Sequence, residues 1–191
     1  MFFHVMKRGM LMGDFVRLSS KYYLRWYTDG TGLTQEALSF SYDLIKAAGF
    51  ARTLFYDKDT PPTNKEFVDF LLSSNHLVFQ LYREDGTPIG LFWLEPFLFT
   101  GKQYLSHFTS FATVPKNELE AGAQETLHFM AVDSPILELY GLTPCCLRHS
   151  WRFARDVLGF EKVTTIKSCV YCLGKERDAI FSVCKLKEKW G

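Results

Sequence analysis

"GLTPCCLRHSWRFARDVLGFEKV", residues 141–163, predicts the end of a strand, a helix and the entry to another strand. Thr143 suits the N-cap of the helix, and Pro144 suits its first position, where the missing N–H costs nothing. Gly159 is the expected helix stop, and Phe160 can pack back on the last turn. We therefore expect a helix over residues 144–158 between two strands.

This helix combines an apolar stripe with basic side chains that project elsewhere. The stripe consists of Leu147, Ser150, Trp151, Ala154, Val157 and Leu158. The basic side chains are Arg148, His149, Arg152 and Arg155. A solvated face on an amphipathic helix is the simpler interpretation of these cations. A ligand-binding face is the alternative.

Composition favours one globular domain. The chain has 191 residues, of which 47% are hydrophobic and 16% aromatic, so it can bury a substantial core. Its 22 basic and 21 acidic residues leave a net charge of +1, which gives no electrostatic argument for nucleic acid or an anionic membrane as a partner. We expect residues 1–21 to form an N-terminal leader and residues 22–191 to form the single domain.

Cysteine usage and the start of the chain favour a cytoplasmic protein. The five cysteines are odd in number and lie in the last quarter of the chain, unlike the staples of a small secreted domain. The first residues do not form a convincing signal peptide, and no apolar run approaches the roughly 20 residues that span a bilayer.

The expected elements alternate between strands and helices. Strands are predicted at 22–28, 76–83, 88–99, 103–114 and 136–141, with two more within 164–186 around the turn 174–178, and helices at 34–50, 63–75, 117–132 and 144–158. The Asp-Gly turn near residue 85 predicts a hairpin. Strand 103–114, helix 117–132 and strand 136–141 form a crossover, which requires a parallel strand pair. The whole sheet is therefore expected to be mixed.

This order, together with Gly159-Phe160 and the hairpin after it, resembles the GCN5-related N-acetyltransferase (GNAT) superfamily. The resemblance covers about residues 22–187 and extends to the GNAT-like proteins of tailed phages. It implies an α/β fold with a mixed, twisted sheet and helices on both faces. Strands 103–114 and 136–141 would splay apart beyond Val114. It also implies transfer of an acyl group from acetyl-CoA to an amine of a small molecule or protein.

The resemblance places the coenzyme around the segment "KNELEAGAQE", residues 116–125. The family motif of Arg or Gln, two residues, Gly, one residue, then Gly or Ala puts Glu118 at the cationic or amide position. This chain keeps small residues at the glycine positions of the motif, but it has no cation or amide at the first position. The implied coenzyme-binding residues are Phe111, Ala112, Thr113 and Val114 for the pantetheine arm, Leu119, Glu120, Ala121, Gly122 and Ala123 for the diphosphate, and Arg148 on the basic helix.

A self-capped helix is an equally good interpretation of this segment. Asn117 followed three residues later by Glu120 forms a capping-box pattern. The carboxylates of Glu118 and Glu120 would then satisfy the positive end of the helix and repel a diphosphate. The alternative function is therefore a GNAT-like scaffold without catalysis, acting as a binding or phage-associated accessory protein.

Acyl transfer to an amine needs a base, and it often uses an acid for the departing thiolate. The family often supplies the acid from a Tyr four residues before the Gly of Gly-Phe, where this chain has Arg155, and its Asn is replaced by Arg148. The candidate bases are Glu95, which interrupts an apolar strand, and His107 on the central strand. A structural role is the alternative for both. His76 is expected at the surface.

The cysteines raise the possibility of zinc. Cys169 and Cys172 have the spacing of a zinc knuckle, and Cys145 with Cys146 could complete the ligand set. Residues three apart on a strand point to opposite faces, so the first pair is not expected to chelate. We predict no bound metal and, in the reduced state, no intramolecular disulfide.

Overall fold

The protein is described by a computed structural model that covers residues 15–28, 31–55, 58, 60–73, 76–98, 101–111 and 114–191. One mixed sheet runs through the molecule in the order β1-β2-β4-β5-β6-β7-β9-β8, and β3 pairs with β2. The strands are β1 (Phe15–Arg17), β2 (Tyr22–Thr28), β3 (Thr31–Gly32), β4 (Leu77–Arg83), β5 (Pro88–Pro96), β6 (Gln103–Ser110), β7 (Glu138–Pro144), β8 (Glu161–Cys172) and β9 (Lys175–Lys185). The described end of the predicted leader therefore contributes an edge strand, β1.

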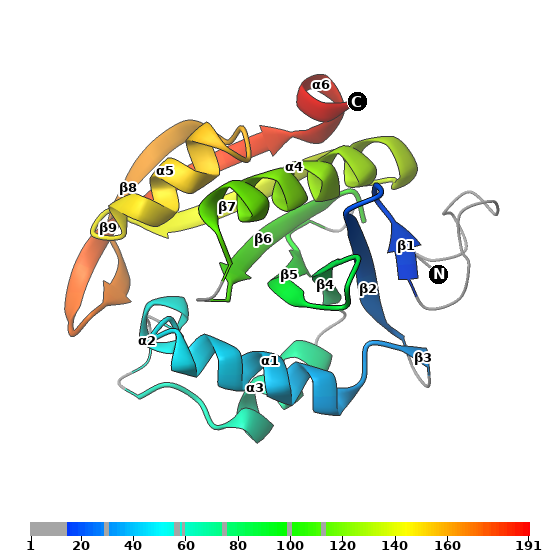
Figure 1. Ribbon diagram of the computed structural model, residues 1–191. Coiled ribbons are helices and arrows are strands. Elements are labelled where there is room, and N and C mark those ends of the chain that lie inside the picture. The colour runs from blue at the N-terminus through cyan, green and yellow to red at the C-terminus, as the bar shows by residue number, and fades with distance from the viewer. Residues whose placement is uncertain are drawn as a thin grey trace.

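Helices cover both faces of the sheet (Figure 1). They are α1 (Gln35–Ala47), α2 (Ala51–Leu54), α3 (Asn64–Ser73), α4 (Lys116–Asp133), α5 (Arg148–Asp156) and α6 (Leu186–Trp190). Helices α1–α3 enclose an aromatic core on one face, around Tyr42, Phe67 and Trp93. Helices α4 and α6, with the C-terminal end of α5, enclose a second core on the other face, around Leu94, Leu127 and Phe160. In the described part of the chain, no helix combines the length and the apolar character that a membrane crossing requires.

Local signals account for several helix ends. Thr34 accepts a hydrogen bond from the N–H of Ala37 and so begins α1. Thr63 and Glu66 form a reciprocal capping box at the start of α3, since each accepts the backbone N–H of the other. The predicted Asp-Gly turn joins β4 to β5, and Gly86 has the positive φ of 86° that such a turn requires.

The predicted parallel pair is present, but its splay begins earlier than expected. Strands β6 and β7 pair only through Gln103↔Glu138, Tyr104↔Leu139 and Leu105↔Tyr140. Beyond these pairs β6 follows β5 up to Ser110, whereas β7 follows β9 up to Pro144. The prediction that the strands part beyond Val114 was wrong, because each strand stays with its antiparallel neighbour and the two leave one another inside the sheet.

The helix after β7 also begins later than predicted. Thr143 and Pro144 do not cap it; they pair with Ile180 and Ala179 as the last residues of β7. Helix α5 begins at Arg148 without a side-chain cap. Its C-terminal end is as predicted, since Gly159 has φ +72° and the N–H of Phe160 donates to the carbonyl of Ala154 at 2.9 Å.

The last hairpin turns at Leu173-Gly174, before the predicted turn at 174–178. Both residues have positive φ, 54° and 78°, as a two-residue turn of the primed type requires. Strand β9 therefore includes Lys175–Asp178, where we expected a polar turn.

Candidate active site

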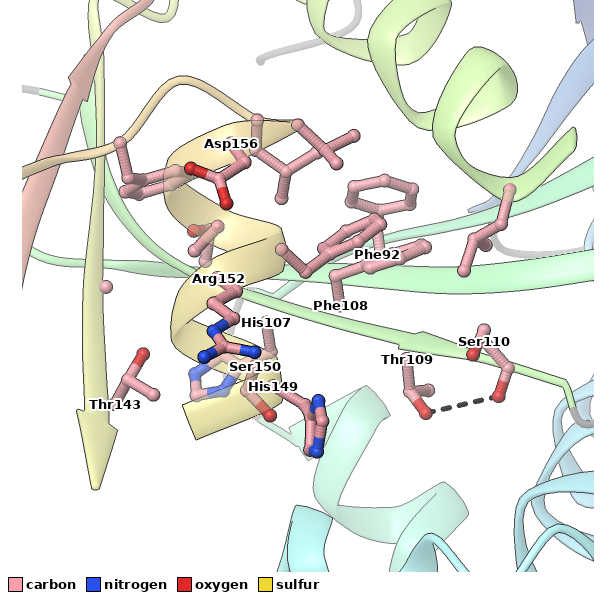
Figure 2. Close-up of a pocket in the computed structure, with 18 of the residues that line it drawn as sticks. Phe92, His107, Phe108, Thr109, Ser110, Thr143, His149, Ser150, Arg152 and Asp156 are labelled. Carbon is pink, nitrogen blue, oxygen red and sulfur yellow. Dashed lines mark hydrogen bonds between the residues drawn. The ribbon is translucent and has the colours of Figure 1, made fainter. Parts of the chain in front are cut away.

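A cavity of about 600 Å³ lies where β6 and β7 part. Its walls come from β6 (residues 106–110), from β7 (residues 141–143), from α5 and from the first turns of α4. Phe50, Thr53 and Leu54, in and just before α2, also line it. Because α2 and α5 lie on opposite faces of the sheet, the cavity passes through the sheet between the diverging strands (Figures 1 and 2).

We call the point where β6 and β7 part the fork, and one side chain bridges the two strands there. Ser106 donates its hydroxyl to the carbonyl of Tyr140 at 3.0 Å, directly after the last parallel pair. From there to Ser110, β6 has a strand partner only on the β5 side. The edge of β6 that faces the cavity therefore offers backbone N–H and C=O groups to a ligand.

The two candidate bases lie together beside this edge. His107 Nε2 is 2.9 Å from Glu95 Oε1, and their side chains are 32% and 30% exposed. This separation is short enough for an ion pair, but the two groups are not oriented for a good hydrogen bond. The His107 ring stacks on Trp93, with 4.8 Å between ring centroids and 3° between ring planes. Contact with His107 holds the pKa of Glu95 below its usual range, against the opposing effect of burial.

His76 is a third member of this cluster, although we expected it at the surface. It is partly buried and packs against Phe70, with 5.0 Å between ring centroids. Burial lowers the pKa of His76, while the nearby carboxylate of Glu95 opposes that shift. The carboxylate of Glu95 thus interacts electrostatically with both imidazoles. Of these three residues, His107 lines the cavity.

Glu118 does not face the cavity. Its carboxylate pairs with Arg83 at the end of β4, and the two side chains are 33% and 29% exposed. The sequence did not reveal this partner, a cation 35 residues earlier in the chain, and the expected position of the carboxylate against a diphosphate stays a prediction.

The other residues of the α4 segment divide between cavity and core. Leu119 and Glu120 line the cavity. Gly122 and Ala123 are buried in the core, and a Cβ atom on Gly122 would lie 2.8 Å from Leu81 Cδ2. Ala121 is partly buried against the same core. Gly122 therefore serves close packing of the helix on the sheet.

The expected capping box at the start of α4 is absent. The N-cap is Pro115, whose carbonyl accepts the N–H groups of Glu118 and Leu119, each at 3.1 Å. Asn117 lies within the first turn, and Glu120 pairs with Lys116 at 3.4 Å. Among the described residues the N–H groups of Lys116 and Asn117 have no backbone acceptor, so the helix end can still donate to an anion.

The remaining coenzyme candidates lie away from the cavity wall or outside the described residues. Phe111 is buried, its N–H donates to Ile89 and its carbonyl accepts from Val114. Val114 is partly buried between the two cores. Ala112 and Thr113 lie outside the described residues. Arg148 is exposed at the start of α5 and does not line the cavity.

Part of the basic face of α5 lines the cavity, which the sequence pattern alone did not show. His149, Ser150 and Arg152 project from α5 into it (Figure 2). Ser150 was expected in the buried stripe but is exposed here. Among the described residues Arg152 has no ion-pair partner within 4.0 Å, although its charge helps to lower the pKa of Asp156, which also lines the cavity. Arg155 instead pairs with Asp156 at 2.6 Å.

Comparison with known proteins identifies the architecture. No protein-family model matches the sequence, and no curated protein matches it. Solved structures do match. RimL, a ribosomal-protein alpha-N-acetyltransferase in complex with coenzyme A, has a TM-score of 0.70 at 11% identity, covering 91% of this chain and 98% of its own. A ribosomal-protein alanine acetyltransferase from Vibrio fischeri has a TM-score of 0.68 at 13% identity, covering 93% and 98%. Spermidine N-acetyltransferase SpeG from Vibrio cholerae has a TM-score of 0.68 at 13% identity, covering 90% and 97%. This chain has the GNAT acetyltransferase fold.

Several features of this cavity could hold a ligand of the size and chemistry of an acyl-CoA. Its volume lies in the range of cofactor sites, it offers the open edge of β6 to a narrow amide-containing arm, and it has Arg152 and the start of α4 for anionic groups. Arg155, which stands where the family often has Tyr, is exposed and paired with Asp156. No tyrosine is among the described residues that line the cavity.

Proposed function

We propose that this protein is an acyl-CoA-dependent N-acyltransferase whose reaction takes place at the fork between β6 and β7. The observation that carries the proposal is a cavity through the sheet with His107 at its wall and Glu95 in contact with that imidazole. A coenzyme would enter from the side of α4 and α5, and the amine acceptor from the side of α2. Acetyl-CoA, when bound, supplies a thioester carbonyl that an amine can attack.

The residues of this chain would bind, orient and move one proton. The edge of β6 at residues 106–110 would hydrogen-bond the amide groups of the pantetheine arm. Arg152 and the free N–H groups at the start of α4 would hold phosphate oxygens. His107 would take the proton that the acceptor nitrogen loses as the C–N bond forms, and Glu95 would stabilise the imidazolium. The acceptor would be a small-molecule or protein amine in the cytoplasm.

Two arginines on α5 provide a matched test of coenzyme binding. Both are exposed cations three residues apart, but Arg152 lines the cavity whereas Arg155 pairs with Asp156. We expect Arg152→Ala to weaken acetyl-CoA binding about tenfold or more, because one phosphate contact is lost, and Arg155→Ala to change it less than twofold. Isothermal titration calorimetry of the wild type and both variants measures this.

The same titration decides between enzyme and scaffold. If the wild type does not bind acetyl-CoA at millimolar concentration, the acyltransferase proposal fails and a GNAT-like binding or accessory protein remains. If it binds, and both arginine variants bind equally well, the coenzyme does not occupy this cavity in the proposed way. Transfer of a radiolabelled acetyl group to a panel of amines then tests the reaction.

A further inference from the structure

Two cysteine thiols meet where the loop before α5 reaches the tip of the β8–β9 hairpin. The sulfur atoms of Cys146 and Cys172 are 3.3 Å apart, although the residues are separated by 26 positions in the chain. Cys146 is exposed, Cys172 is buried, and both are free thiols. We propose that these two residues form a redox-active pair that closes to a reversible disulfide when the protein is oxidised.

Backbone hydrogen bonds hold both thiols in place. The carbonyl of Pro144 accepts the N–H of Leu147 at 2.9 Å, which forms a turn with Cys146 inside it. The N–H of Cys145 donates to the carbonyl of Asp178 at 2.8 Å and fixes this turn against β9. Cys172 pairs with Lys175 at the closed end of the last hairpin. The approach of the two sulfur atoms is therefore set by the fold.

The other cysteines lack this arrangement. Cys145 and Cys169 are exposed, and the described residues place no sulfur within hydrogen-bond distance of either. Cys184 is buried, and its thiol donates to the carbonyl of Leu158 at 3.4 Å. Cys145 and Cys169 each lie within a few residues of one member of the pair, so they are matched controls.

The two thiols have different parts in the oxidation. Burial and the contact with Cys146 raise the pKa of Cys172 to about 12, so this thiol stays neutral. The exposed Cys146 meets the oxidant: its thiolate takes one oxygen atom from a hydroperoxide, giving a sulfenic acid and releasing an alcohol or water once the departing oxyanion is protonated. The sulfur of Cys172 then displaces the sulfenic hydroxyl, which leaves as water with the Cys172 proton. Two thiols and one hydroperoxide thus give one disulfide, one water and one alcohol or second water.

The disulfide would fix the start of the helix that lines the cavity. Helix α5 begins two residues after Cys146, and its first two turns carry His149 and Arg152 into the cavity. The other end of the link is the hairpin tip, which is held by the β8–β9 ladder. Oxidation would therefore restrict movement of α5 relative to strands β8 and β9.

Trypsin digestion gives a direct test, because cleavage at lysine and arginine releases residues 117–148 and 168–175 as separate peptides. The reduced full-length protein is treated with hydrogen peroxide, alkylated, digested and analysed by mass spectrometry. We expect these two peptides to be joined with the loss of two hydrogen atoms, and dithiothreitol to separate them. Cys146→Ser and Cys172→Ser should abolish the link, whereas Cys145→Ser and Cys169→Ser should keep it.

Two results would overturn the proposal: no link between these peptides in the oxidised wild type, or a link that persists in Cys146→Ser. If Cys172→Ser does not fold, the double variant Cys145→Ser/Cys169→Ser decides, because only the proposed pair then remains in the two peptides. A disulfide that matches the native geometry should also raise the melting temperature of the oxidised protein by about 5–10 °C, reversed by dithiothreitol. A fall in melting temperature on formation of the link would show that the native structure does not accommodate the bond, and would equally overturn the proposal.

Discussion

His107 lies at the cavity wall in contact with Glu95, and His76 interacts electrostatically with the same carboxylate. If His107 is the base, Glu95 acts through it as a positioning residue. We expect Glu95→Gln to lower kcat for acetyl transfer by about 10²-fold with little change in the KM for acetyl-CoA, because an amide cannot stabilise an imidazolium.

The pH profile separates this role from a structural one. The low-pH limb of the kcat profile should change in Glu95→Gln, because the variant lacks the carboxylate whose pKa is held below its usual range in the wild type. Glu84→Gln, which removes an exposed carboxylate paired with Arg17, serves as the control and should leave the profile unchanged. An unaltered profile in Glu95→Gln would remove Glu95 from the mechanism.

The same carboxylate should give a pH-dependent contribution to stability. The pKa of Glu95 is depressed in the folded protein, so its contribution is present above the ordinary glutamate pKa of about 4.3 and is lost as the pH falls through the lower folded value. We expect Glu95→Gln to be less stable than the wild type by about 1 kcal/mol at pH 6, and the difference to shrink toward pH 3. Urea denaturation at both pH values measures it; a difference that grows on acidification would contradict the depressed pKa.

Glu118 shows why a residue's neighbours in sequence do not determine its partner. Its position in the sequence predicted repulsion of a diphosphate, whereas the structure pairs it with Arg83. We now expect Glu118→Gln to change the Kd for acetyl-CoA less than twofold and to lower stability by no more than about 1 kcal/mol, because the pair is partly exposed. Calorimetry and thermal unfolding of this variant provide the two values. Tenfold tighter binding would place the carboxylate at the diphosphate after all.

Helix α4 lies close to the sheet because Gly122 has no side chain. A Cβ atom there would lie 2.8 Å from Leu81 Cδ2 and 3.2 Å from Ile89 Cδ1. Alanine improves helix propensity by about 1 kcal/mol, but crowding in a packed core costs about 1–3 kcal/mol. We expect Gly122→Ala to be net destabilising by up to about 2 kcal/mol in urea denaturation. Ala121→Gly, at the neighbouring position, tests propensity without crowding and should cost up to about 1 kcal/mol. A more stable Gly122→Ala would show that the helix can move away from the sheet.

Elements with a local cause were predictable from the sequence, and elements that depend on distant partners were less so. The parallel pair followed from the crossover, and the end of α5 followed from Gly159-Phe160. The start of α5 did not, since Thr143-Pro144 satisfies the preferences of a helix start but the ladder with β9 extends β7 through both residues. The same holds for the site: Glu95 was identified because it interrupts an apolar strand, and His107 because it lies on the central strand. His149 and Arg152 could not be distinguished from a solvated basic face, because only the packing of α5 beside β6 brings them to the cavity.

The fork between β6 and β7 has a consequence for the molecule as a whole. Three residue pairs, the Gln103–Glu138 hydrogen bond and the Ser106–Tyr140 hydrogen bond join the two strands, while every other ladder keeps β1–β6 on one side and β7–β9 on the other. The sheet therefore consists of two panels with a short hinge at one end, and the cavity occupies the angle between them. A small rotation about that hinge would widen or narrow the open end of the cavity without breaking a ladder in either panel. The width available to a ligand would then depend on the closed end of the fork, several residues away from the groups that would contact the ligand.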